Sequence, residues 1–289
     1  MSTIEFMLPF YGSPAYLLET VESVRAQSDR EWNLTILDDD PDPHACDAVL
    51  AMNDPRIQLV RNPTRLGLHR NFQAAFDRAR ADYVVVLGSD DRLLPNYLAT
   101  VRAATASGAE MIHPGVRVID ADGARHLPMA DRIKQAMMPH PRALRSYAGQ
   151  PLMSSLMTGN WAYFPSVCWR TEAVRGRQLV AHDIVVDLAL MVDVLLDGGR
   201  MAIVPEVCFE YRRHGASVSS LRAELGSRFD EEQAFLDETA RRLDAHGWHG
   251  AAFAARARLT SRLHSALTAA RVRSTDRAAA ARLVRAAIS

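Results

Sequence analysis

The chain has 289 residues, 48% of them hydrophobic, and its 34 basic and 34 acidic side chains give a formal net charge of zero. This length suits one large domain or a domain with an extension, and the apolar content is ample for a continuous core. Balanced charge argues against a nucleic-acid-binding protein, because phosphate contacts normally leave a basic excess. No stretch reaches the roughly 18–20 apolar residues of a membrane span, and the N-terminus lacks a signal-peptide pattern. The three cysteines are too few and too far apart for a disulfide framework, so we expect a cytoplasmic protein without a transmembrane segment.

The first hundred residues alternate short apolar runs with helical periodicity, which predicts a parallel α/β sheet. One amphipathic helix is predicted after the capping residue Ser13, with Leu17, Val21 and Val24 on one face. A second is predicted to start near Asn71, so that two βαβ units result. The strands expected around these helices are 4–8, 34–37, 57–60 and 83–87.

The middle of the chain gives weaker signals. Residues 113–165 contain six prolines and no sustained period, so we expect irregular structure there. A helix over 185–195 is predicted to end at Gly198, with a strand at 201–204 directly after it. From about Ser227 the sequence is rich in Ala, Arg and Leu and poor in strand signals, which predicts helices with a break at 247–250.

Three regions follow from this pattern. Residues 1–110 and 111–220 are interpreted as two halves of one sheet domain, and residues 221–289 as a C-terminal helical extension. The last 39 residues hold eight arginines against one acidic residue, Asp276. A solvated helix face explains that excess better than an anionic partner does, and pairing of two copies through these helices is a further expectation.

Two acidic clusters follow predicted strands. LDDDPD at 37–42 comes after the second strand, and GSDD at 88–91 comes after the fourth. The carboxyl ends of parallel strands meet at one edge of a sheet, so the clusters are expected to share a crevice. Crowded carboxylates repel one another unless a cation or hydrogen-bond donors compensate them. A divalent Mg²⁺ or Mn²⁺ that bridges to a phosphorylated ligand is therefore the favoured interpretation, and simple turn-capping by aspartates is the alternative.

Other phosphate-binding α/β folds do not match. A dinucleotide-binding fold requires G-x-G-x-x-G after the first strand, where LPFYGSPAY has the single glycine Gly12. A P-loop requires GxxxxGK[ST], and the one lysine of the chain is Lys134. A phosphatase with a nucleophilic aspartate would carry its acidic motif after the first strand, which here ends near Pro9.

Five segments, in order, resemble the family 2 glycosyltransferases, which are inverting enzymes with the GT-A fold, a Rossmann-like, mostly parallel sheet flanked by helices. The resemblance covers about residues 3–218. Its segments are LPFYGSPAYLLETVESVRAQS, LTILDDDPD, RNPTRLGLHRNFQAAFDRARADYVVVLGSDDRLLPNYL, VVDLALMVDVLLDGGR and VPEVCFEYRRHGASVS.

The resemblance implies a site for a nucleoside diphosphate sugar. It assigns the nucleobase and ribose to the end of the first strand and to the first acidic turn, and the ribose and a divalent metal to the GSDD segment. Many relatives carry an aspartate where this chain has Gly88, which leaves open which of the two following aspartates is the direct metal ligand. The residues carried over for the donor and metal are Pro9, Tyr11, Asp38, Asp39, Asp90 and Asp91. Arg65 and Arg70 are added as candidates for base or phosphate contacts, and the N-terminus of the second predicted helix would assist an anion. For Arg70, simple pairing with a surface aspartate is the alternative.

The chemistry requires one base. A metal can stabilise the leaving diphosphate without a general acid, whereas the acceptor hydroxyl benefits from a carboxylate base. The family places this base at the start of the helix before the GG turn, which implies Asp187, with Val186 where a glutamate is common and Asp183 as the second choice. An ordinary N-terminal helix charge is the alternative for Asp187.

Further residues complete the expected site. The resemblance places His214 near the diphosphate or metal, and Arg212, Arg213 and His214 together could form a lid over the phosphates. Trp161 falls where relatives border the donor sugar, although an aromatic residue is often part of a core.

Together these observations predict a metal-assisted, inverting glycosyltransferase that moves a sugar, with UDP as the expected carrier, to an acceptor hydroxyl. Two alternatives stay open. One is a sugar-nucleotide nucleotidyltransferase, and the other is a non-catalytic sugar-nucleotide- or glycan-binding protein on the same fold.

Overall fold

A nine-stranded sheet forms the centre of the protein, seen in a computed structural model that describes residues 2–179, 185–214, 227–272 and 284. The strand order is β3-β2-β1-β4-β8-β6-β9-β5, and β7 pairs with β9 outside this path. The strands are β1 (Ile4–Phe10), β2 (Asn33–Asp38), β3 (Ile57–Arg61), β4 (Tyr83–Val86), β5 (Arg92–Leu93), β6 (Met111–Ile119), β7 (Arg145–Ala148), β8 (Cys168–Arg170) and β9 (Arg200–Arg212).

Parallel pairing dominates the sheet. β3, β2, β1 and β4 are mutually parallel, and β6 runs parallel to β9. β8 is antiparallel to both of its neighbours, β4 and β6, so β4, β6 and β9 all point the same way. The predicted α/β class is confirmed.

The first half of the chain also confirms the predicted helices. α1 (Pro14–Arg25) begins where the Ser13 hydroxyl accepts a hydrogen bond from the amide of Tyr16, and the predicted apolar stripe is fully buried. α3 (Leu68–Arg78) begins three residues before Asn71, because Gly67, with φ of 79°, ends the preceding loop there. α2 (Asp47–Leu50) and α4 (Tyr97–Ala104) complete this half.

The expectation of irregular structure over 113–165 is wrong. β6 occupies its start, and α5 (Met129–Met137), β7 and α6 (Gly149–Thr158) follow. β6 is buried on both faces and its register shifts beside Pro114, so the two-residue alternation of a strand is absent from its sequence. Pro151 lies in the first turn of α6, where a missing amide hydrogen costs nothing.

The sheet separates two apolar cores. Alternate residues of β1 point to opposite sides, as the pleat requires: Phe6 and Leu8 join the core under α1 and α4, and Met7 joins the core under α3, α6 and α8 (Val186–Leu196). α7 (Thr171–Val174) also lies on this second side.

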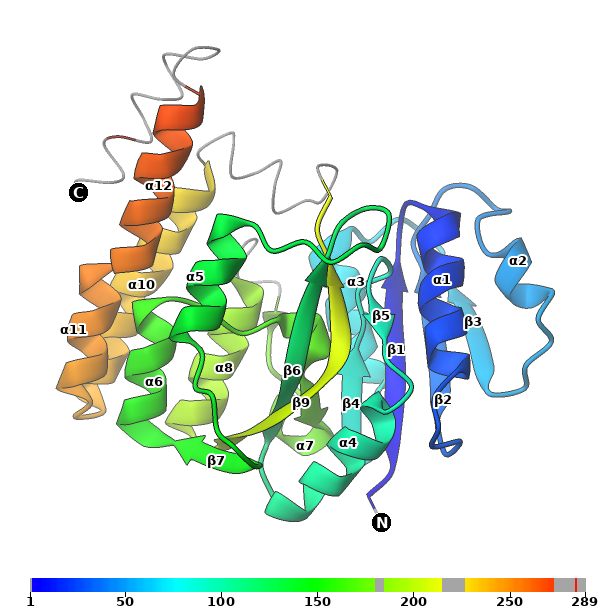
Figure 1. The fold of residues 1–289 in the computed structure, drawn as a ribbon, viewed down its shortest axis with the longest axis horizontal. Coiled ribbons are helices and arrows are strands. Elements are labelled where there is room, and N and C mark those ends of the chain that lie inside the picture. The colour runs from blue at the N-terminus through cyan, green and yellow to red at the C-terminus, as the bar shows by residue number, and fades with distance from the viewer. Residues whose placement is uncertain (1, 180–184, 215–226, 273–283, 285–289) are drawn as a thin grey trace.

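The described residues 227–272 are largely helical, as predicted. α10 (Ser227–Ala245), α11 (His249–Ala257) and α12 (Leu259–Val272) stack beyond α6 and α8, at the opposite end of the molecule from β3 and α2 (Figure 1). The break is at Gly247, with φ of 83°. Phe235 and Leu243 of α10 belong to the same core as α6 and α8, so these helices complete the core of the sheet domain. No helix among the described residues is long and apolar enough to cross a membrane.

Candidate active site at the carboxyl edge of the sheet

The candidate site lies where β1, β2, β3 and β4 end. Asp38 at the end of β2 pairs in register with Phe10 of β1 on one side and Arg61 of β3 on the other. The loops that leave this edge are 11–13, 39–46, 62–67 and 87–91, and they carry most of the predicted site residues.

Asp38 is compensated by the protein itself. One of its carboxylate oxygens accepts two hydrogen bonds from the guanidinium of Arg61, at 2.8 and 2.6 Å, and the other accepts from the amide of Asp40 at 3.1 Å. The Asp38 side chain is fully buried. The sequence alone did not identify Arg61 as a site residue. Its position opposite Asp38 becomes evident only when the register of β2 and β3 is known.

Asp39 organises the loop at 62–67. Its two carboxylate oxygens accept hydrogen bonds from the Asn62 amide group at 3.0 Å, from the Leu66 amide at 2.7 Å and from the Gly67 amide at 2.8 Å. The residue is 5% exposed. Asp39 therefore fixes the loop that carries Arg65 and leads into α3, and its charge is compensated without a metal.

An aromatic and cationic platform is exposed beside this loop. The guanidinium of Arg65 lies 4.3 Å from the ring centroid of Tyr11, which is 51% exposed. Arg70, in the first turn of α3, is exposed and makes no hydrogen bond or ion pair within the described ranges of the chain. Pro9 is buried inside β1. The edge thus offers Tyr11, Arg65 and Arg70 to a ligand, with Pro9 behind them.

Asp90 and Asp91 differ sharply in exposure. Asp91 is 1% exposed, and its Oδ1 accepts a hydrogen bond from the backbone amide of Arg212 at 2.9 Å. Its Oδ2 is buried and has no hydrogen-bond partner among the described residues. Burial and the neighbouring Asp90 raise the pKa of the Asp91 carboxyl well above its usual range. The Asp90 side chain is 31% exposed and lies 2.8 Å from Nε2 of His214.

The arrangement of Asp90 and Asp91 suits a divalent ion. A Cβ atom placed on Gly88 would lie 2.6 Å from Asp91 Oδ2 and 3.0 Å from Asp90 Oδ1, so the two carboxylates converge on one small space. Within the described ranges, no group of three or more acidic, histidine or cysteine side chains is arranged to hold a metal ion. Two carboxylates without a full cage suit Mg²⁺ or Mn²⁺, because such ions usually take their remaining ligands from phosphates and water.

Arg213 points away from this space. Its guanidinium makes two hydrogen bonds to Asp131 of α5, at 3.0 and 2.9 Å, and the Asp131 side chain is 1% exposed. Tyr163 donates a third hydrogen bond to Asp131 at 3.0 Å. Arg213 therefore ties β9 to α5 and is already engaged, whereas His214, the next residue, reaches Asp90.

Trp161 belongs to the core. It is 0% exposed, its indole nitrogen donates to the Ser155 hydroxyl at 3.1 Å, and its ring packs edge-on against His113. The structure leaves Trp161 no exposed face on which a sugar could stack.

Asp187 lies in the first turn of α8 and is partly exposed. Its Oδ2 accepts a hydrogen bond from the Asn160 amide group at 2.7 Å, and its Oδ1 accepts from the Leu188 amide at 2.8 Å. α8 runs back to the start of β9, so its first turn is directed toward the edge where the parallel strands end (Figure 1). Asp183, the second choice, lies outside the described residues.

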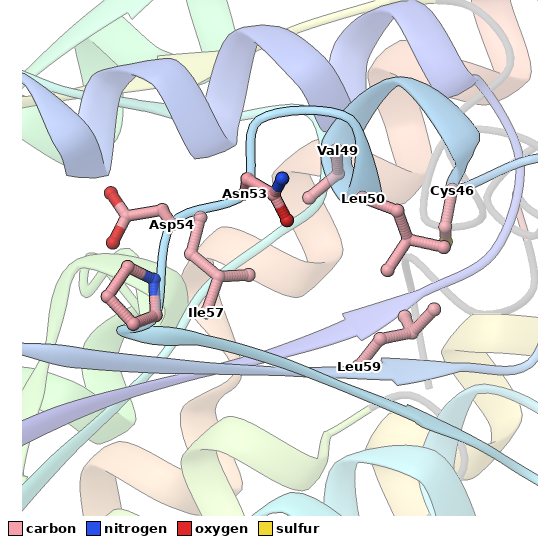
Figure 2. Close-up of a pocket in the computed structure, with 8 residues that line it drawn as sticks. Cys46, Val49, Leu50, Asn53, Asp54, Ile57 and Leu59 are labelled. Carbon is pink, nitrogen blue, oxygen red and sulfur yellow. The ribbon is translucent and has the colours of Figure 1, made fainter.

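A separate cavity of about 300 Å³ lies between α2 and β3 (Figure 2). It is lined mainly by apolar side chains, including Val49, Leu50 and Leu59. Burial and the nearby Asp38 raise the pKa of the Cys46 thiol at its wall to about 12, so this thiol is neutral near pH 7. The cavity contains none of the predicted site residues.

Comparison with known proteins decides the family. A model of glycosyl transferase family 2 matches residues 6–171, which is more than half of the chain and contains both acidic clusters. The chain belongs to glycosyl transferase family 2. The family match covers β1 to β8 and the start of α7, whereas Asp187, Arg212 and His214 lie beyond its end.

Among curated relatives, this glycosyltransferase is 26% identical to the succinoglycan biosynthesis protein ExoO of Rhizobium meliloti (strain 1021), over 81% of this chain and 68% of ExoO. It is 30% identical to the abequosyltransferase RfbV of Salmonella typhimurium (strain LT2), over 37% of this chain and 34% of RfbV. The solved structure of S. aureus TarS in complex with UDP-GlcNAc superposes with a TM-score of 0.62 at 14% identity, over 95% of this chain and 74% of TarS. That likeness supports the GT-A fold.

Proposed function

We propose that this glycosyltransferase transfers a sugar from a nucleoside diphosphate sugar, with UDP as the carrier, to an acceptor hydroxyl with inversion at the anomeric carbon. The observation that carries the proposal is the pair Asp90 and Asp91, which converge at Gly88 with His214 beside them and include one buried carboxylate oxygen that has no partner among the described residues. The TarS structures contain UDP or UDP-GlcNAc, which supports UDP as the first carrier to test.

The donor would lie along the carboxyl edge of the sheet. Tyr11 and Arg65 offer a stacked, exposed surface to the nucleobase and ribose, and Asp39 holds the Arg65 loop in place through three hydrogen bonds. Arg70 and the N-terminus of α3 offer positive charge to the diphosphate.

Asp90 and Asp91 are the residues that would hold a divalent ion, and His214 is hydrogen-bonded to Asp90 beside them. When bound, the ion would supply positive charge to the leaving diphosphate as a Lewis acid. Asp90 is the accessible ligand and Asp91 the buried one, and Asp91 is anchored by the Arg212 amide.

Asp187 is proposed as the general base. In the transfer, the bond between the anomeric carbon and the diphosphate oxygen breaks, and the acceptor oxygen bonds to the same carbon from the opposite face. Asp187 takes the proton of the acceptor hydroxyl, and the electron pair of the broken bond leaves with the nucleoside diphosphate. Asn160 holds one oxygen of the Asp187 carboxylate and thereby orients the base.

A thermal-shift panel of UDP, GDP, CDP and dTDP with and without Mn²⁺ tests the donor class. A ligand at about 100 times its dissociation constant stabilises a protein by roughly 2.7 kcal/mol, so the expected result is a clear shift with UDP that requires Mn²⁺. If none of these nucleotides changes the melting temperature, the proposed donor site is contradicted.

Asp187→Asn tests the reaction class, with Asp197→Asn at the other end of α8 as its matched control, because Asp197 is exposed and paired with Arg177. Asp187→Asn is expected to bind UDP normally and to lose transfer, on the order of a hundredfold or more, as loss of a general base implies. The control is expected to keep activity. Formation of a UDP-sugar and pyrophosphate from UTP and a sugar 1-phosphate would favour a nucleotidyltransferase, and donor binding without any turnover by the wild type would favour a binding protein.

A further inference from the structure

Arg212, the last residue of β9, is a buried cation with an unusual number of partners. Its side chain is 1% exposed, so it has no free surface with which to contact a donor or an acceptor. Every polar group of its guanidinium is nevertheless used, and three different segments of the chain supply the partners. The anchoring of Asp91 by the Arg212 amide does not account for these side-chain contacts.

Two of the contacts are hydrogen bonds from Arg212 to the acidic loop at 87–91. The backbone amide of Arg212 donates to Asp91 Oδ1 at 2.9 Å, and its side-chain Nε donates to the carbonyl oxygen of Asp90 at 2.6 Å. One residue thus holds both aspartates, one through its carboxylate and the other through its main chain. The guanidinium also places positive charge beside two carboxylates that repel each other.

The remaining contacts anchor Arg212 to the rest of the protein. Its terminal nitrogens donate to Glu19 of α1 at 2.5 Å and to the carbonyl oxygen of Ala121 at 2.7 Å. The guanidinium lies 4.7 Å from the ring centroid of Tyr16, and the His214 ring also contacts that ring, at 5.4 Å between centroids. Arg212 and Tyr16 therefore fix His214 relative to Asp90 as well.

We propose that Arg212 is the positioning residue of the metal site: it sets the spacing of Asp90, Asp91 and His214 without touching the ion or the donor. This inference rests on the proposed function, because it concerns the same site. A lysine keeps the charge but cannot replace the arrangement, since only the planar guanidinium offers five donors in a fixed fork. Side chains that orient metal ligands typically contribute tenfold to hundredfold to metal affinity.

The test compares Arg212→Lys with Arg102→Lys. Arg102 is a matched control, because it is also well buried and donates to Asp29, Ser2 and Glu31, but it lies beside the start of β1, at the opposite edge of the sheet. The dissociation constant of Mn²⁺ is measured by calorimetry in the presence of UDP, and the melting temperature is measured without metal.

The expected result is a Mn²⁺ dissociation constant that rises roughly tenfold to hundredfold in Arg212→Lys and stays at the wild-type value in Arg102→Lys, although both variants lose thermal stability. A wild-type dissociation constant in folded Arg212→Lys overturns the inference while leaving the proposed function intact. Failure of the wild type to bind Mn²⁺ with UDP overturns the metal role itself, and with it the inference.

Glu19→Gln keeps the test decisive if Arg212→Lys does not fold. The substitution removes the charge that pairs with the guanidinium of Arg212, and with that of Arg92, while keeping a hydrogen-bond acceptor, and it leaves Asp90, Asp91 and His214 unchanged. A rise of about threefold in the Mn²⁺ dissociation constant is expected, in line with a partly exposed ion pair. An unchanged constant contradicts the positioning role.

Discussion

The two acidic clusters look alike in sequence but differ in how their charge is compensated. In the first, Asp38 binds Arg61 and Asp39 binds three donors of the 62–67 loop, so protein groups take up the carboxylate oxygens. In the second, Asp91 Oδ2 is buried without a partner among the described residues, and Asp90 is partly exposed. The first cluster therefore builds the loop beside the donor site, and the second is the one with capacity left for a ligand.

Removing a carboxylate from the second cluster should have the largest effect on activity. Asp90→Asn removes the accessible ligand of the proposed metal site, and loss of about 3 kcal/mol of charge stabilisation corresponds to a fall in kcat of roughly a hundredfold. Steady-state kinetics across a Mn²⁺ titration measures it. Wild-type kcat in this variant would place the metal, or the chemistry, elsewhere.

A methyl group at Gly88 should act on the second cluster without removing a ligand. The added Cβ would lie 2.6 Å from Asp91 Oδ2, and normal contacts are above 3.0 Å, so the carboxylate must move. Gly88→Ala is expected to weaken Mn²⁺ binding about tenfold, because changes that reorient a metal ligand typically cost tenfold or more in metal affinity. Calorimetry measures the constant, and Gly250→Ala, whose added Cβ would meet its nearest neighbour at an ordinary 3.5 Å, is the control. Equal Mn²⁺ binding in Gly88→Ala and the wild type would show that Asp91 is not a ligand.

A substitution in the first cluster should change the stability of the protein more than its metal binding. Arg61→Ala leaves the buried Asp38 carboxylate without its main donor, which is expected to lower the free energy of unfolding, by less than loss of a fully buried ion pair because Arg61 is 42% exposed. Urea unfolding measures it. If Arg61→Ala also abolished Mn²⁺ binding in folded protein, the distinction between the two clusters would be lost.

The smallest expected effect lies outside both clusters, at His113. Burial lowers the pKa of this imidazole to about 4, so it is neutral in the folded protein at pH values where the unfolded chain takes up a proton. The unfolded state then binds more protons, and stability falls as pH drops below about 6.5 toward 4, by at most about 1.4 kcal/mol per pH unit.

Urea unfolding at pH 7.5 and 5.5 checks this, with His113→Gln as the comparison, since glutamine does not titrate. His113→Gln should lose less stability than the wild type between these two pH values. Equal losses would assign the pH dependence to other groups, including the carboxylates of the clusters.

The first half of the fold could be predicted because its helices and strands carry clear periods. α1, for example, shows a buried stripe at Leu17, Val21 and Val24 together with the Ser13 cap. β6 could not be found, because a strand buried on both faces has no alternation and its register shifts at Pro114. Helices and strands with one solvent-exposed face are therefore easier to predict from the sequence than those buried on all sides.

The site shows a similar limit. The order of motifs was enough to group Asp90, Asp91 and His214, which the structure brings together. It was not enough to separate neighbours: Arg212 and Arg213 were both predicted to help cover the phosphates, yet Arg213 binds Asp131 and Arg212 holds the acidic loop. Successive residues of a strand point to opposite faces, so a choice between them requires the register.

The place of α10 and α11 in the core affects how the protein can fold while it is being synthesised. Their apolar residues complete a core that also contains Met7 of β1 and Val84 of β4, which are made some 150–240 residues earlier. A nascent chain that has just released β9 from the ribosome still exposes the apolar faces of α6 and α8. Completion of this half of the molecule must therefore wait for the last helices, and until then those faces are the surface that a chaperone would protect from aggregation.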